Sequence, residues 1–367
     1  MQIAEITKSI THLQQRGLGI IIDDSAQQAK SVLFSIGQTI SEARLNEMLS
    51  ISASQVFVTL NKSRRQAFEL APMQRSSSTE SMHRSAFPLC ESVEAREGIH
   101  TGISIHDRTA TIKVLSASDP NPKHIVKPGH IFPIEVVEGG VLVKPAVFEA
   151  ASDIASLLLK NEVAAVVDLL TDDGSYCNPE QAHKLAAKND IAVFALSSLV
   201  VYRLRTEHLI EKVAQSKLPV PSGRIFEVST YRSKLNGVEH VSLSLGGNFD
   251  SGPVLTRVHR EKLFSDIFET LSGEHPSILG RSIAAIEKEG RGLIVYLRTP
   301  QQSAFLDSAA SMNSTPVGRN VLFREFGVGA QIIKQCGVQK IILLSTSSVV
   351  PEGLENFGLE ITALRQL

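Results

Sequence analysis

Short apolar runs constrain the fold of this chain more than any other feature of its sequence. Gly17–Ile22, Val163–Leu170 and Ile191–Leu196 are shorter than buried helices and lack the alternation that is typical of half-exposed strands. Strands of this kind lie in a sheet that is covered on both faces, and helices supply that cover. Met1–Gln15 and Asn178–Lys188 have the spacing of such helices, so the sequence predicts a layered α/β architecture.

The second half of the chain predicts further strands and helices. Arg224–Val228 and His240–Leu245 alternate apolar and polar residues, and Asn236-Gly237 between them suits a hairpin turn. The other predicted elements, alternately helix and strand, are Ser277–Lys288, Gly292–Leu297, Gly329–Cys336 and Lys340–Leu344. In the first half, by contrast, Thr101 to Gly140 has the pattern of turns between short apolar segments.

The length of 367 residues predicts two domains. The best boundary candidate is Glu207–Ser222, where a helical pattern runs into prolines. We therefore expect one domain at residues 1–205 and a second at residues 218–367.

Charge and apolar content exclude several classes of protein. Lys and Arg number 37 against 38 Asp and Glu, so the net charge of −1 gives no general attraction for nucleic acid or an anionic membrane. The apolar runs fall well short of the ~20 residues of a transmembrane helix, and the charged start does not resemble a secretion signal. Cys90, Cys177 and Cys336 are too dispersed for a disulfide framework or a cysteine-built zinc site. We expect a cytoplasmic protein without nucleic-acid or membrane partners.

Longer motifs resemble two known enzyme families. HTGISIHDRTATI and IVKPGHIFPIEVVEGGVLVKP, within His100–Pro145, resemble 3,4-dihydroxy-2-butanone-4-phosphate synthase, an early enzyme of riboflavin biosynthesis. KLPVPSG, GPVLTRVHREKL, AAIEKEGRGLIVYLR and REFGVGAQIIKQCGVQKI resemble GTP cyclohydrolase II, in that family's order. The resemblance implies an N-terminal α+β domain of the synthase type, which forms a homodimer, and a C-terminal α/β domain of the cyclohydrolase type.

The synthase family holds magnesium over ribulose 5-phosphate with an acid-rich loop and a histidine, and it removes the C4 carbon as formate. Here the loop reads DDSAQQAKSV, with Gln28 and Lys30 in place of acids, and Val147 replaces the histidine. Mg²⁺ prefers carboxylate oxygens, and an added lysine opposes it electrostatically. The resemblance therefore implies that neither a bound metal nor another cofactor is to be expected.

Other positions of the synthase motifs keep their polar groups. His130 is intact in Pro128-Gly129-His130, and Asp168 stands where the family has a catalytic glutamate, so these two residues are the candidate catalytic pair. The candidate residues for binding a small phosphorylated ligand in this half are Asp24, Ser104, Asp107, Arg108, Thr111, Lys144 and Glu149. An alternative is that these residues support turns and the dimer core.

The cyclohydrolase motifs also depart from their family. Its three zinc-binding cysteines align with Lys262, Gly273 and His275, which cannot form a tetrahedral zinc site. Arg257, His259 and Arg324 are retained as candidate ligand-binding residues, although residues 299–321 do not align clearly with the family.

These departures leave three functional hypotheses. The first is a repurposed or non-catalytic paralogue of the riboflavin fusion protein, which binds a phosphosugar, a nucleotide or a partner enzyme. The second is a metal-independent enzyme of specialised metabolism that uses His130 and Asp168. The third is residual synthase activity on ribulose 5-phosphate.

Overall fold

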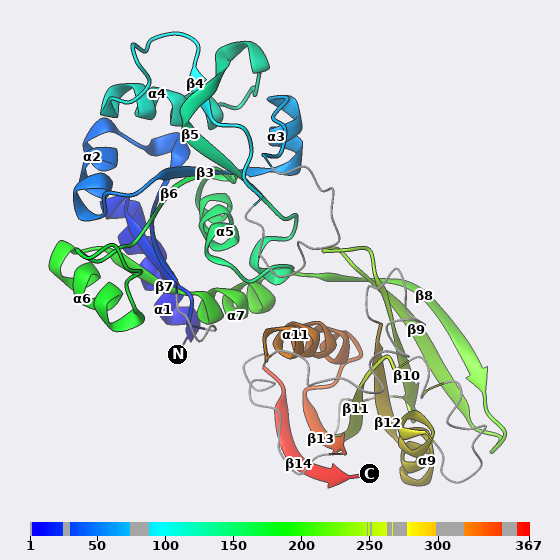
Figure 1. Ribbon diagram of the computed structural model, residues 1–367. Coiled ribbons are helices and arrows are strands. Elements are labelled where there is room, and N and C mark those ends of the chain that lie inside the picture. The colour runs from blue at the N-terminus through cyan, green and yellow to red at the C-terminus, as the bar shows by residue number, and fades with distance from the viewer. Residues whose placement is uncertain are drawn as a thin grey trace. The chain divides into compact units, whose positions relative to one another are not determined.

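The computed structural model describes residues 2–24, 30–73, 88–247, 249, 252–262, 266, 277–298, 319–346 and 358–367. The chain forms two compact units, which divide between Tyr202 and Arg203 (Figure 1). Each unit is built on its own mixed sheet.

The N-terminal unit has a seven-stranded sheet in the order β4-β5-β3-β6-β2-β1-β7. Its strands are β1 (Gly19–Ile22), β2 (Ser31–Ile36), β3 (Val56–Asn61), β4 (Val93–Ala95), β5 (Ile125–Val136), β6 (Ala164–Asp168) and β7 (Ala192–Ala195). Its helices are α1 (Gln2–Arg16), α2 (Glu42–Ile51), α3 (Lys62–Ala67), α4 (Ile105–Leu115), α5 (Val147–Leu159), α6 (Pro179–Asn189) and α7 (Leu196–Thr206), of which α7 crosses the division between the units. Short 3₁₀ turns occur at Gly37–Thr39, Pro122–His124 and Gly140–Leu142.

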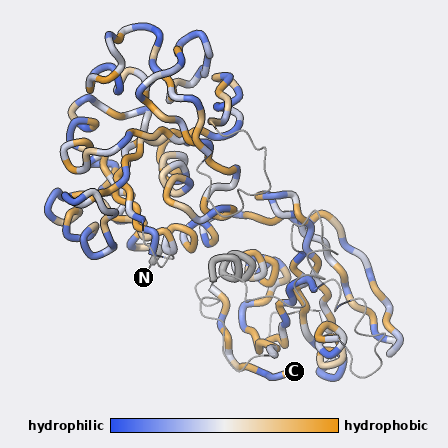
Figure 2. The backbone as a smooth tube through the Cα atoms, viewed as in Figure 1, coloured by the Kyte–Doolittle hydropathy of each residue, from blue (hydrophilic) through white to orange (hydrophobic). Residues whose placement is uncertain are grey.

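The core of this unit lies on both faces of the sheet. Every residue of β1 and β2 is buried, as the continuous apolar pattern of β1 predicts. One face carries Val56, Val167 and Ile131, which join a cluster with residues of α2, α4 and α6. The opposite face packs on α5, which is buried over most of its length. Figure 2 shows α5 and the central strands mostly in apolar colours, whereas the peripheral helix α6 carries more polar residues.

The C-terminal unit has a second seven-stranded sheet, in the order β14-β13-β11-β12-β10-β9-β8. Its strands are β8 (Ile210–Pro219), β9 (Ile225–Ser233), β10 (Glu239–Leu245), β11 (Val254–Arg260), β12 (Gly292–Leu297), β13 (Lys340–Ser345) and β14 (Glu360–Gln366), and its helices are α9 (Ile278–Glu289) and α11 (Arg319–Gln335). The half from β8 to β12 is antiparallel, and β12, β11, β13 and β14 are parallel to one another. The predicted β9–β10 hairpin is present.

Two predictions from sequence periodicity are wrong. Glu207–Ser222 is not a helix that runs into prolines, because Ile210–Pro219 forms strand β8, which pairs along its length with β9. Strand β8 is an edge strand whose residues are exposed beyond Ile210. Because neither of its faces is buried, its sequence does not alternate apolar and polar residues as a half-buried strand would. Thr101 to Gly140 contains helix α4 and the long strand β5 rather than short segments between turns.

Within the described part of the chain, no helix has the length and apolar character needed to cross a bilayer.

Candidate active site

Strand register places the two candidate catalytic residues at one edge of the N-terminal sheet. Strand β3 lies between β5 and β6, with Val56 opposite Val167 and Phe57 opposite Phe132. Continuing this register by one residue puts Gln55 between Asp168 and His130. The Gln55 amide donates a hydrogen bond to the backbone carbonyl of His130 at 3.1 Å, as this position requires. Neighbouring strands are about 4.8 Å apart, so the two backbones are about 10 Å apart.

The side chains along this edge project from the same face. Val167 and Ile131 belong to the core cluster on the other face, and side chains alternate along a strand. Asp168 therefore points to the face that α5 covers, and by continuing the alternation from Ile131 we infer the same for His130. Lys30 precedes β2, whose Val32 is opposite Asp168, and the same alternation places it on this face. The structure thus brings a histidine, a carboxylate and an ammonium group to one edge of one sheet.

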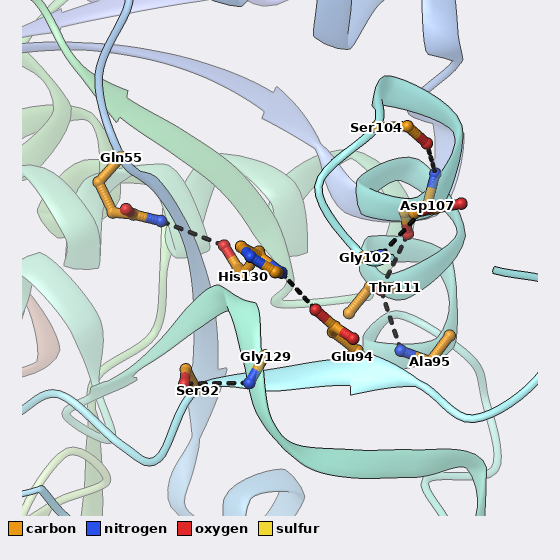
Figure 3. A network of polar contacts seen from close by, with 10 residues as sticks. All are labelled: Gln55, Ser92, Glu94, Ala95, Gly102, Ser104, Asp107, Thr111, Gly129 and His130. Atoms are coloured by element: carbon orange, nitrogen blue, oxygen red, sulfur yellow. Dashed lines mark hydrogen bonds and ion pairs between the residues drawn. The ribbon is translucent and has the colours of Figure 1, made fainter. Parts of the chain in front are cut away.

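Glu94 of β4 supports His130 directly, and sequence reasoning missed it. The Glu94 carboxylate lies in close polar contact with Nδ1 of His130 (Figure 3). Nδ1 facing a carboxylate is the nitrogen that carries the proton in the neutral ring, which leaves the lone pair on Nε2. The His130 side chain is 45% exposed and that of Glu94 only 14%, so the imidazole is accessible to solvent while Glu94 is largely enclosed.

Two glycines make room for Glu94. A Cβ atom at Gly102, where φ is +80°, would lie 1.7 Å from the Glu94 carboxylate, and one at Gly129 would lie 2.1 Å from the backbone of Val93. The backbone N–H of Gly129 also donates to the hydroxyl of Ser92 at 3.2 Å. The glycine of the Pro128-Gly129-His130 motif is therefore required for the close approach of β4 and β5.

Polar residues of α4 and its N-cap hold the loop that contains Gly102. The buried Asp107 carboxylate accepts from the Gly102 N–H at 2.9 Å, and the Ser104 hydroxyl accepts from the Asp107 N–H at 3.0 Å (Figure 3). Thr111 donates to the Asp107 carbonyl at 2.9 Å and accepts from the Ala95 N–H at 3.0 Å. Burial alone would raise the pKa of Asp107, but the N–H groups of His100 and Gly102 and the Ser104 hydroxyl outweigh it and hold that pKa below its usual value.

Ser104, Asp107 and Thr111 thus make hydrogen bonds within the protein, beside the loop that contacts Glu94. Arg108 follows Asp107 on α4 and is partly buried, and this burial lowers the pKa of its guanidinium. That these four residues contact a ligand stays a prediction.

A second polar cluster lies where β6 ends and α5 begins. Lys30 Nζ is 2.8 Å from the Asp168 carboxylate, and the Tyr176 hydroxyl donates to the other Asp168 oxygen at 3.5 Å. Lys144 Nζ is 3.0 Å from Glu149, whose side chain is only 1% exposed in the first turn of α5. The remaining candidate, Asp24, makes no hydrogen bond or ion pair with this cluster among the described residues, and it accepts from the Ser197 backbone N–H at 3.0 Å at the start of α7.

The acidic groups of this cluster do not fit magnesium. An ammonium group already faces each of Asp168 and Glu149, and a divalent cation beside either would meet like charge at close range. Within the described ranges, no three His, Cys, Asp or Glu side chains are grouped so as to hold a metal. Gln27 and Gln28 of the substituted loop lie outside these ranges.

The C-terminal unit has its own buried polar group around His259. Nε2 of His259 is 2.9 Å from Asp266, which also accepts from the Tyr296 hydroxyl at 2.9 Å. Burial would raise the pKa of Asp266, but the hydrogen bonds from His259 and Lys262 outweigh it and lower that pKa. Arg257 donates to the Leu344 carbonyl at 2.9 Å.

The described residues cover the predicted cyclohydrolase site only in part. Of the three positions that align with zinc ligands, only Lys262 is described, and its ammonium is not a zinc ligand. Gly273 and His275 lie outside the described residues, as does the side chain of Arg324.

Comparison with known proteins decides the family. Residues 7–202 match 3,4-dihydroxy-2-butanone 4-phosphate synthase, and residues 211–366 match GTP cyclohydrolase II. The chain belongs to the riboflavin biosynthesis family that fuses these two domains. It is 30% identical to riboflavin biosynthesis protein RibBA of Aquifex aeolicus over 97% of this chain and 90% of that protein. It is 31% identical to 3,4-dihydroxy-2-butanone 4-phosphate synthase of Photobacterium phosphoreum over 98% of both chains.

A solved structure shares the whole fold of this family member. That structure is RibBX, a two-domain 3,4-dihydroxy-2-butanone 4-phosphate synthase from A. baumannii, which matches this chain with a TM-score of 0.78 and 24% sequence identity. The matched region covers 99% of this chain and 98% of the RibBX chain. The predicted fold class, with a synthase-like N-terminal domain and a cyclohydrolase-like C-terminal domain, is confirmed.

The first functional hypothesis is wrong. Relatives about 30% identical over nearly the full length are named as riboflavin biosynthesis enzymes, and nothing among them indicates a repurposed or non-catalytic paralogue. The hypothesis rested on the substituted metal positions, and such substitutions do not by themselves exclude an enzymatic activity.

Proposed function

We propose that the N-terminal domain converts ribulose 5-phosphate to 3,4-dihydroxy-2-butanone 4-phosphate and formate. The observation that carries the proposal is the common edge and face of His130, Asp168 and Lys30. The names of the relatives that span both domains support the same activity.

The chemistry of this conversion matches the groups on the sheet edge. The five-carbon phosphate splits into a four-carbon keto phosphate and formate, with atoms and electrons balanced and no co-substrate. What the protein must supply is proton transfer next to a carbonyl and a place for the phosphate. His130 Nε2, with Glu94 behind Nδ1, acts as the base. Asp168, about 10 Å away across strand β3, relays protons at a second point of the bound sugar phosphate.

Positive charge for the phosphate comes from the start of α5. Lys144 lies beside the first turn of this 13-residue helix, whose N-cap residue Ala146 makes no side-chain cap hydrogen bond. A helix N-terminus and a lysine together attract phosphate. We also propose, from the family resemblance, that the domain acts as a homodimer.

We propose further that the C-terminal domain does not hydrolyse GTP with zinc. Lys262 replaces one zinc cysteine, and its backbone N–H donates to Asp266 at 3.0 Å, so this position is fixed in the buried group around His259. The Photobacterium relative spans both domains and is named for the synthase alone.

Complementation tests the two assignments separately. The gene is expected to restore growth without riboflavin to a bacterium that lacks its synthase, and not to one that lacks GTP cyclohydrolase II. An H130A variant in the same vector, produced to the same level, is the control and should restore neither. Rescue of the cyclohydrolase strain alone would contradict both assignments.

A further inference from the structure

Lys30 is held at the sheet edge by three separate side chains. Besides the 2.8 Å ion pair with Asp168, its ammonium lies 5.3 Å from the centre of the Phe148 ring and 5.0 Å from that of Tyr176. Cation–π contacts at these distances stabilise an ammonium that has lost part of its water. The Lys30 side chain is 20% exposed, so the group is fixed in place and still reaches solvent.

The three contacts come from different parts of the chain. Asp168 ends β6, Phe148 is in the first turn of α5, and Tyr176 lies in the turn after β6, bridged to Leu170. The Phe148 ring is itself packed edge-on against Phe57 of β3, with 5.6 Å between the ring centres. A solvated surface lysine does not require such surroundings, so this arrangement places a positive charge at a defined point.

We propose that the Lys30 ammonium takes the role for which the related synthases use a divalent cation. It holds the oxygen-rich sugar phosphate beside Asp168, so that substrate binding and turnover need no Mg²⁺. The turnover part rests on the proposed synthase function, and the binding part does not.

The charges at the edge favour this reading over an added metal. The two carboxylates Asp168 and Glu149 already face Lys30 and Lys144, so neither is left to attract a divalent cation. An ammonium offers hydrogen-bond donors to carbonyl and hydroxyl oxygens, which are the ligands that Mg²⁺ would otherwise take.

The test compares binding and turnover in EDTA and in Mg²⁺. Ribulose 5-phosphate binding is measured by titration calorimetry, and formate release is measured in the same two buffers. The wild type is expected to give the same affinity and rate in both. K30M keeps the aliphatic stem but removes the charge, and it should weaken binding in EDTA by about 10- to 100-fold, the loss of one charge-assisted hydrogen bond.

Two further variants control for structural damage. K30Q keeps a donor for Asp168 but no charge, and it should lose affinity as K30M does while the melting temperature stays near that of the wild type. K184M removes another lysine that pairs with a carboxylate, Glu180 on α6, and should bind as the wild type does. Circular dichroism on each variant confirms that it is folded.

The outcomes separate the two proposals. Formate release and binding that both require Mg²⁺ would leave the synthase function standing and overturn the role of Lys30. Binding in EDTA that depends on Lys30 without any formate would support Lys30 and overturn the synthase function. Wild-type affinity in both K30M and K30Q, or no binding in either buffer, would also overturn the role of Lys30.

Discussion

Replacing His130 with alanine is expected to lower the rate of formate release by about 10²- to 10⁴-fold, the usual contribution of a general base. The ring stands on β5 with Nδ1 against Glu94, and His130 is the one histidine in strands β3, β5 and β6. Because the side chain is 45% exposed, its removal should scarcely change the melting temperature. Steady-state kinetics with ribulose 5-phosphate gives the measurement.

Two companion variants identify the cause of that loss. Added imidazole should restore part of the activity of H130A, because the vacated position is open to solvent, and it should not improve the wild type. H12A removes another histidine that faces a carboxylate, since His12 lies 3.1 Å from Asp190, but on α1 beside the other end of the sheet. H12A should keep full activity. Equal loss in H12A and H130A would mean that the effect is structural.

Acidification is expected to destabilise the C-terminal unit through His240. Burial, followed by repulsion from Arg298, lowers the pKa of this histidine from 6.5 to about 4. Its Nδ1 accepts the Arg298 backbone N–H at 3.2 Å, which only the neutral ring can do. The unfolded chain therefore binds a proton more readily than the folded unit does. The contribution of neutral His240 to the free energy of unfolding is fully present above pH 6.5, and about 3 kcal/mol of it is lost as the pH falls to about 4.

Hydrogen exchange at the amides of β10 and β12 measures this loss in the unit concerned. An H240N variant keeps an acceptor for the Arg298 N–H but does not titrate, so its exchange should depend much less on pH between 6.5 and 4. Asp266 and other carboxyl groups contribute equally to the pH dependence of the wild type and of H240N, so their effect cancels when the two exchange profiles are subtracted. Identical pH profiles in the two proteins would show that His240 is not responsible.

The sequence predicted those parts of the fold that burial dictates. Gly19–Ile22 and Ala164–Asp168 are central strands with helices on both sides, and their apolar runs allow hardly any other structure. Ile210–Pro219 is an exposed edge strand, and only its pairing with β9 makes it a strand, which a local pattern cannot reveal. Helix α4 begins after Ser104, which caps its first turn. Serine is also common in turns, and among the neighbouring turn residues it did not indicate the start of a helix.

The candidate site was predictable only where a motif carried it. His130 and Asp168 followed from the family resemblance, but Glu94 sits in a three-residue strand whose pairing with β5 shifts register at that point. No spacing in the sequence connects it to a histidine 36 residues away. Lys30 looked like the loss of an acid, and its meaning depends on Asp168, Phe148 and Tyr176, which come together only in the folded sheet.

The most direct test of the central claim follows one labelled carbon. Ribulose 5-phosphate with ¹³C at C4 is incubated with the full-length protein, and the products are recorded by ¹³C NMR. The account predicts that the label appears in formate and that an unlabelled four-carbon keto phosphate accumulates in equal amount. A label that stays in the five-carbon substrate, in the presence as well as the absence of Mg²⁺, would contradict it.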